Sequence, residues 1–282
     1  MDIIQGIIIG LVQGLTEFLP VSSSAHLIFI QNILGVGENN LAFDVLLHLG
    51  TLVAVIIYYI KDIVKMIEAF ILSILDIFKG KFIEGFRKNP YKKLSWFVIV
   101  GTIPAGIVGK IFNSQIESAF NTLIFPGFFL LITGTLLYFS QRINIGNRKI
   151  NKIGFKDAII IGISQAIAIL PGISRSGTTI STGLLLGINK EFAAKFSFLL
   201  SIPAILGAGI IEVNDLGVNL DTNIYVYVFG FLTALISGYL GISILIKTIK
   251  EKSLDFFAYY CWIVGILVLI YLFIIHFKLY LF

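Results

Sequence analysis

Side chains that can transfer protons or act as nucleophiles lie inside the first apolar segment of this sequence. Between Gln13 and His26 stand a carboxylate, Glu17, and a hydroxyl, Ser23. A carboxylate can bind a cation or take up a proton, a hydroxyl can act as a nucleophile, and an imidazole can serve as acid or base. Because such groups are costly among apolar residues unless they face a cavity, we interpret them as catalytic. The alternatives are that the serines cap a helix and that His26 is a satisfied core histidine.

A second polar group interrupts the apolar segment 157–188. It contains Arg175, whose guanidinium keeps its charge and matches phosphate oxygens bidentately. Small residues around it predict the start of a helix, where free backbone N–H groups and the helix dipole favour an anion. The alternative is an arginine that only pairs with a buried carboxylate such as Glu17. The residues predicted to bind phosphate are Ser174, Arg175, Ser176, Gly177 and Thr178.

The composition indicates that lipid surrounds most of the chain. Of the 282 residues, 57% are hydrophobic and 13% are charged, and the mean hydropathy is +0.96, which lies far outside the range of soluble domains. The net charge of +5 could suggest nucleic acid as a partner. The basic residues, however, are confined to a few stretches between apolar runs, a pattern typical of membrane topology. We therefore expect an all-α integral membrane protein that does not bind nucleic acid.

The apolar runs divide the chain into full crossings and interrupted segments. Six runs have roughly the 20 residues that a membrane-spanning helix needs. They are 41–60, 94–112, 120–139, 191–211, 224–246 and 256–275. Segments 1–34 and 157–188 are broken near the middle by Pro, Ser and Gly, so each predicts a re-entrant helical hairpin. Segment 62–83 mixes charged and apolar residues and predicts an amphipathic helix that lies on the membrane surface.

The distribution of Lys and Arg predicts the orientation of these segments. Stretches 61–93, 140–156 and 247–252 are basic and 212–223 is acidic, so the basic stretches, including loop 140–156, should be cytoplasmic. The two hairpins then enter from opposite faces, the first from outside.

They also align with each other at an offset of 152 residues, with Gln13 on Gln165 and Ser22 on Ser174. We expect one membrane domain, 1–282, built as an inverted repeat with halves of about 1–139 and 157–275.

The two broken segments resemble the signature motifs of a known family. Residues 13–26 read QGLTEFLPVSSSAH and residues 171–179 read PGISRSGTT, which closely resembles the bacterial undecaprenyl-pyrophosphate phosphatases, also called bacitracin-resistance proteins. The resemblance implies hydrolysis of the C55 polyprenyl pyrophosphate to the monophosphate carrier lipid, which is recycled for cell-wall synthesis. It also implies a multi-pass protein of the bacterial cytoplasmic membrane and is compatible with a homodimer.

The same resemblance implies roles for individual residues. Glu17, Ser23, His26 and Arg175 match residues important for activity, and a divalent cation, Mg²⁺ or Ca²⁺, is required. Many members of the family carry a second acid where this chain has Gln13, so Glu17 and Gln13 are the expected metal ligands with only one carboxylate between them.

We expect Ser23 to attack phosphorus with His26 as acid or base. The mechanistic rival is a metal-activated water, with Ser23 only positioning it. The site is expected to open to the outer face. The alternative function is that of a transporter or flippase for a phosphorylated polyprenyl lipid, because inverted repeats with broken helices are also transporter architecture.

Overall fold

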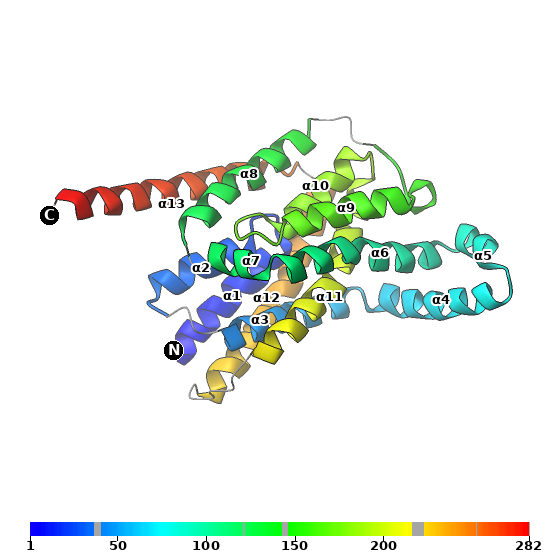
Figure 1. Ribbon diagram of the computed structural model, residues 1–282, viewed down its shortest axis with the longest axis horizontal. Coiled ribbons are helices and arrows are strands. Elements are labelled where there is room, and N and C mark those ends of the chain that lie inside the picture. The colour runs from blue at the N-terminus through cyan, green and yellow to red at the C-terminus, as the bar shows by residue number, and fades with distance from the viewer. Residues whose placement is uncertain (37–40, 121, 143–145, 216–222, 252, 282) are drawn as a thin grey trace.

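The computed structural model describes residues 1–282 except 37–40, 121, 143–145, 216–222, 252 and 282. The described residues form helices joined by short turns (Figure 1). In chain order these helices are α1 (Ile3–Phe18), α2 (Ser23–Ile33), α3 (Leu41–Tyr58), α4 (Ile60–Phe78), α5 (Phe82–Lys88), α6 (Pro90–Ile111), α7 (Asn113–Phe120), α8 (Ile124–Ser140), the 3-10 helix η1 (Ile150–Lys152), α9 (Phe155–Ile167), α10 (Arg175–Leu185), α11 (Lys190–Asp215), α12 (Ile224–Glu251) and α13 (Asp255–Leu281). The all-helical class predicted from the sequence is confirmed.

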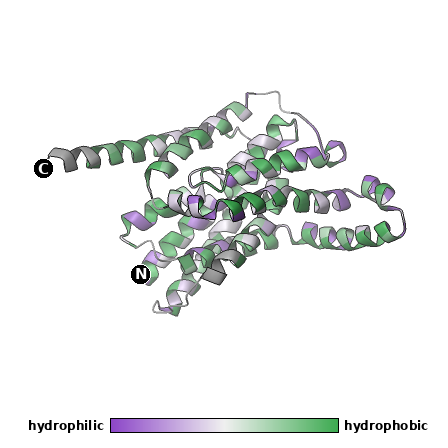
Figure 2. Ribbon diagram, in the orientation of Figure 1, coloured by the Kyte–Doolittle hydropathy of each residue, from purple (hydrophilic) through white to green (hydrophobic). Residues whose placement is uncertain are grey.

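Five of the described helices are long and apolar enough to cross a membrane: α3, α6, α11, α12 and α13. They correspond to five of the six predicted crossings. The remaining predicted crossing, 120–139, differs because α8 has only 17 residues. α8 reaches the length of a membrane span only together with α7, and the two helices are bent by 98° relative to each other. Figure 2 shows hydrophobic residues along most of the long helices, as expected for helices that contact lipid.

Two pairs of shorter helices are interrupted where the sequence predicts breaks. α1 ends at Phe18 and α2 begins at Ser23, whereas α9 ends at Ile167 and α10 begins at Arg175. Proline cannot continue a helix without losing a hydrogen bond, which explains why Pro20 lies in the first break. Ser22 and Ser174 are the N-caps, with side chains that accept from the backbone N–H of Ala25 and Gly177. Each break is therefore followed by a helix that a serine side chain caps.

Glycines allow the first broken helix to pack closely on a spanning helix. A Cβ placed on Gly10 of α1 would lie 2.4 Å from the carbonyl oxygen of Gly230 in α12, and one on Gly14 would lie 2.4 Å from that of Ala234. A glycine also lets the second broken helix pack closely on its neighbour, since a Cβ on Gly162 of α9 would lie 2.3 Å from the carbonyl oxygen of Gly101 in α6. Small residues at such crossings let helix backbones approach each other in membranes.

The replacement Gly10→Ala is therefore expected to destabilise the protein by about 1–3 kcal/mol, because the added methyl group must displace the backbone of α12. Gly106→Ala in α6 is the matched control, since a Cβ there meets open space. Thermal unfolding of the detergent-solubilised protein measures both. A Gly10→Ala variant as stable as the Gly106→Ala variant would show that this close packing does not limit stability.

The predicted surface helix 62–83 corresponds to α4 and the start of α5. α4 packs beside the first half of α6, where Trp96 donates to the Ser73 hydroxyl at 2.9 Å and Lys92 pairs with Asp76. Its other side exposes apolar residues, including Ile67, Ile71 and Phe78. The placement of α4 on the membrane surface stays a prediction. Part of the predicted cytoplasmic loop 140–156, residues 143–145, lies outside the described residues.

Candidate active site

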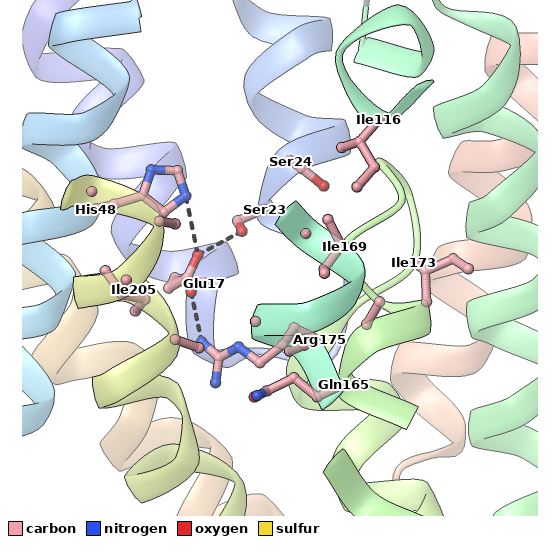
Figure 3. Close-up of a pocket in the computed structure, with 18 of the residues that line it drawn as sticks. Glu17, Ser23, Ser24, His48, Ile116, Gln165, Ile169, Ile173, Arg175 and Ile205 are labelled. Carbon is pink, nitrogen blue, oxygen red and sulfur yellow. Dashed lines mark hydrogen bonds and ion pairs between the residues drawn. The ribbon is translucent and has the colours of Figure 1, made fainter. Parts of the chain in front are cut away.

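The carboxylate of Glu17 lies at the centre of a cluster that joins the two breaks (Figure 3). Its Oε1 accepts a 2.6 Å hydrogen bond from Nη2 of Arg175, which is also an ion pair. Its Oε2 accepts hydrogen bonds from Ser23 Oγ at 2.6 Å and from Gln13 Nε2 at 3.0 Å. The structure thus brings together three of the four predicted catalytic residues, Glu17, Ser23 and Arg175, from segments more than 150 residues apart in sequence.

Direct contacts between the two breaks hold this cluster in place. The Ser176 hydroxyl donates to the carbonyl oxygen of Leu19 at 3.1 Å, and the backbone N–H of Gly172 donates to the Ser24 hydroxyl at 3.4 Å. Gly172 has φ +101°, and a Cβ there would lie 2.5 Å from the backbone oxygen of Pro126, so only glycine fits. These contacts fix the start of α10, and with it Arg175, against the end of α1.

The first break also stores backbone strain. Ser22 has φ 68°, a conformation that is uncommon for residues other than glycine. Its carbonyl oxygen is bonded to His26 Nδ1 at 2.8 Å, and its side chain caps α2. Strained conformations persist where the surroundings enforce them and are concentrated at functional sites. This backbone conformation of Ser22 comes directly before Ser23, whose hydroxyl lies within hydrogen-bonding distance of Glu17.

His26 is bonded to groups other than Ser23, and the expectation that it assists this hydroxyl stays a prediction. Its Nδ1 contacts the Ser22 carbonyl oxygen, and its Nε2 lies 2.8 Å from the hydroxyl of Tyr260, on whose ring it stacks. Both ring nitrogens are therefore engaged. The group that contacts the Ser23 hydroxyl is the Glu17 carboxylate.

A different histidine, His48 of α3, lies beside the carboxylate. Its Nε2 is 3.9 Å from Glu17 Oε2, and its Nδ1 is 2.8 Å from the carbonyl oxygen of Asp44. A ring whose Nδ1–H donates to a carbonyl presents Nε2 as the proton-accepting atom. The sequence places Asp44 and His48 on one helix face, but that spacing alone is equally compatible with an ordinary helix contact.

The five residues predicted to bind phosphate divide into two groups. Ser174 and Arg175 line the cavity, whereas Ser176, Gly177 and Thr178 do not. These three are buried, and a Cβ on Gly177 would lie 3.3 Å from Pro20. Ser176 and Gly177 therefore pack the second break on the first, and Thr178, which follows them in the chain, is buried. The sequence predicted the anion site from Arg175 and from the start of a helix. Of the five predicted phosphate-binding residues, only Arg175 and Ser174, the N-cap of that helix, line the cavity.

A cavity of about 390 Å³ opens from this cluster. Its floor carries Glu17, Ser23, His48 and Arg175, and most of its wall is apolar. The apolar wall residues come chiefly from α6, α7 and α11 and include Ala105, Ile116, Phe120, Ala204 and Ile205. A polar floor below an apolar wall is suited to a molecule with a charged head and a hydrocarbon chain.

Few side chains near Glu17 could bind a cation. Among the described residues, no group of three or more His, Cys, Asp or Glu side chains could hold a metal ion. Beside Glu17, however, the Oε1 of Gln13 is buried and has no hydrogen-bond partner among the described residues. One carboxylate and one amide oxygen are ligands of the kind that Mg²⁺ takes, together with water and substrate phosphates, and the amide of Gln13, whose Nε2 now faces Glu17, would turn its Oε1 toward such an ion.

These features define a helical membrane protein with a buried acid, arginine and serine site below an apolar cavity. Residues 6–267 match the family described as Bacitracin resistance protein BacA. The chain belongs to this family.

Three relatives extend the similarity along the whole chain, and each is named undecaprenyl-diphosphatase. The protein of Methanobrevibacter smithii is 61% identical over 95% of this chain and 97% of its own length. That of Methanosphaera stadtmanae is 49% identical over 96% and 98%. That of Alkaliphilus metalliredigens is 47% identical over 96% and 99%.

Proposed function

We propose that the protein hydrolyses undecaprenyl pyrophosphate to undecaprenyl phosphate and inorganic phosphate. The observation that carries the proposal is the pairing of Glu17 with Arg175 at the floor of an apolar-walled cavity, with the Ser23 hydroxyl on the same carboxylate. Arginine provides the charge that pyrophosphate needs, and the apolar wall suits a polyprenyl chain. The names of the relatives support the same activity.

In the mechanism we propose, Ser23 attacks the terminal phosphorus while Glu17 takes up its proton. The hydrogen bond from Ser23 to Glu17 Oε2 provides the path for that proton. The bond between Oγ and phosphorus forms, and the bond from phosphorus to the bridging oxygen breaks, leaving the lipid monophosphate. Water then cleaves the phosphoserine and releases phosphate.

Arg175 stabilises the charge on the phosphoryl oxygens during this reaction. In the substrate-free site its guanidinium pairs with Glu17, and the arriving pyrophosphate competes for the same N–H groups. Since Arg175 cannot lose its charge, this exchange keeps its guanidinium paired with an anion both before and after the substrate binds. In this mechanism Glu17 is therefore the partner of Arg175 whenever no substrate is bound.

A divalent cation, Mg²⁺ or Ca²⁺, is part of the proposal. The carboxylate of Glu17 and the Oε1 atom of Gln13, which has no hydrogen-bond partner among the described residues, would bind this cation together with phosphate oxygens of the substrate. When bound, such an ion neutralises charge on the phosphoryl oxygens and helps to orient them.

The membrane arrangement that we propose is an inverted repeat with two re-entrant hairpins. Its support is the packing: α1 contacts α12 as α9 contacts α6, and the pairs α3–α11 and α8–α13 contact each other. The cavity is lined by parts of α6 and α11 far from the basic stretches that precede them, such as Gly106 and Gly207. With those stretches in the cytoplasm, the site opens to the outer face.

Phosphate release by the purified protein in detergent tests this function. Detergent micelles have no two sides, so a transporter or flippase releases no phosphate, whereas a hydrolase does. We expect release from undecaprenyl pyrophosphate with Mg²⁺ or Ca²⁺, and a fall of at least about tenfold when EDTA removes the cation, because charge neutralisation at the phosphoryl oxygens is lost. Readdition of the cation is the control. No release in any cation would overturn the proposal, and release unaffected by EDTA would remove the metal from it.

A further inference from the structure

Gln165, near the end of α9, is a buried polar residue that the mechanism above does not use. It is 2% exposed and lines the cavity that contains Arg175. Neither its Nε2 nor its Oε1 has a hydrogen-bond partner among the residues that the structure describes. A buried amide without partners costs stability, so its presence in the wall of a ligand cavity points to a partner that arrives with the ligand.

Comparison with the equivalent position in the first break shows why this amide is unpaired. Gln13 lies one helical turn before Glu17 and donates to its carboxylate at 3.0 Å. One turn after Gln165 the chain has Ile169, which also lines the cavity and offers no hydrogen bond. The two glutamines thus occupy matching positions, but only Gln13 has a carboxylate beside it.

The side chain of Gln165 is directed toward the phosphate-binding arginine. Figure 3 shows its amide end turned toward the guanidinium of Arg175, on the side away from Ser23. Arg175 uses Nη2 for Glu17, and its Nη1 contacts the Ser197 carbonyl oxygen at 3.4 Å, a long hydrogen bond. A pyrophosphate has more oxygens than one guanidinium can satisfy, and an amide can donate to one of them and carries no charge of its own.

We propose that Gln165 is a substrate-binding residue whose Nε2–H₂ group donates to a non-bridging oxygen of the pyrophosphate held by Arg175. This inference rests on the proposed phosphatase function for the identity of the ligand. The half of the chain that provides Arg175 then provides the phosphate clamp, with Gln165 as its second member, while the other half provides Ser23 and Glu17.

Gln165→Leu tests the proposal, because leucine keeps much of the shape and removes both polar atoms. We expect KM for undecaprenyl pyrophosphate to rise about tenfold or more through loss of a hydrogen bond to a charged group, with a smaller change in kcat. Gln165→Glu places a negative charge beside the phosphates and should be more severe. The thermal midpoint of Gln165→Leu without ligand should not fall, since a buried unpaired amide is removed.

Ser164→Ala is the matched control, because Ser164 precedes Gln165 in the same turn and its hydroxyl donates to the Ile161 carbonyl oxygen within α9. Its KM should stay within about twofold of the wild-type value. A Gln165→Leu variant with the wild-type KM would overturn the proposal. A Gln165→Leu variant whose thermal midpoint is lowered, and whose KM rises no more than that of Ser164→Ala, would also overturn it.

Binding of inorganic pyrophosphate, followed by the thermal midpoint, separates this inference from the proposed function. We expect pyrophosphate with Mg²⁺ to stabilise the wild type, and Gln165→Leu to need about tenfold more of it for the same shift. If Gln165→Leu needed about tenfold more pyrophosphate than the wild type for this stabilisation but the wild type hydrolysed no lipid, the phosphatase function would fail and the phosphate contact would stand. If pyrophosphate stabilised the wild type and Gln165→Leu equally, or neither, the contact would be overturned.

Discussion

Replacing Arg175 by alanine is expected to lower kcat/KM for undecaprenyl pyrophosphate by about 10³-fold or more, because arginines that neutralise transferring phosphoryl groups contribute about 10³–10⁵-fold. Arg175→Lys should recover only a small part of this loss, since an ammonium group cannot bind phosphate oxygens bidentately. Phosphate release by the purified variants in detergent measures both. Activity of Arg175→Ala within tenfold of the wild type would contradict the assignment of Arg175 to the phosphates.

Stability provides the control for this experiment. Removing Arg175 leaves the buried Glu17 carboxylate without its 2.6 Å partner, and breaking a buried pair in this way costs about 3–5 kcal/mol. The double variant Glu17→Gln with Arg175→Ala removes both charges, so its thermal midpoint should recover toward the wild-type value while activity stays absent. Loss of activity in this stable double variant cannot be assigned to unfolding, and it reports on Glu17 and Arg175 together, whereas the comparison of Arg175→Ala with Arg175→Lys reports on Arg175 alone.

Ser23→Ala is expected to lower kcat by about 10³-fold or more, because removing the nucleophile of a covalent mechanism leaves only the contribution of substrate binding and charge stabilisation. The reason lies in the geometry: Ser23 is the hydroxyl that contacts the Glu17 carboxylate, at 2.6 Å. Rapid quench of the wild type with undecaprenyl pyrophosphate should trap phosphate on Ser23, which mass spectrometry detects.

Ser24→Ala is the matched control, since Ser24 also lines the cavity but its hydroxyl accepts from the Gly172 backbone. Its effect should be at least about tenfold smaller than that of Ser23→Ala, because it removes one backbone contact and leaves the nucleophile in place. Absence of phosphoserine in quenched wild type, together with substantial activity of Ser23→Ala, would favour the rival mechanism in which a metal-activated water attacks.

Most of the fold could be predicted from the sequence because hydropathy and helix breakers act locally. The apolar runs correspond to α3, α6, α11, α12 and α13, and the Pro, Ser and Gly clusters mark both breaks. Glu17 and Arg175 could be recognised as partners because two buried opposite charges, each costly alone, gain by pairing. The α7–α8 bend could not be predicted, since the polar pair Asn121 and Thr122 at the start of the otherwise mostly apolar run 120–139 does not by itself indicate a 98° turn.

The detailed site could not be predicted where it depends on the direction in which a helix faces. His26 lies three residues from Ser23 in sequence, yet the rotation of α2 directs its ring to Tyr260 in α13. His48 comes from another helix, and only the packing of α3 beside α1 places it near Glu17. Gln165 and Gln13 match in sequence, but among the described residues only Gln13 donates a hydrogen bond, because Glu17 lies one turn after Gln13 whereas Ile169 lies one turn after Gln165. Such contacts depend on tertiary packing, which a single sequence does not display.

The central claim is that the two breaks together form one hydrolytic site, and a product measurement on three purified proteins tests it most directly. Inorganic phosphate and undecaprenyl phosphate should be quantified from undecaprenyl pyrophosphate in detergent with Mg²⁺. The wild type should release the two products in a one-to-one ratio. Ser23→Ala, which is altered in the first break, should release neither product above background. The same result is expected for the stable double variant Glu17→Gln with Arg175→Ala, which is altered at both breaks. A folded double variant that forms both products at the wild-type rate, or a wild type that forms neither, would contradict the account.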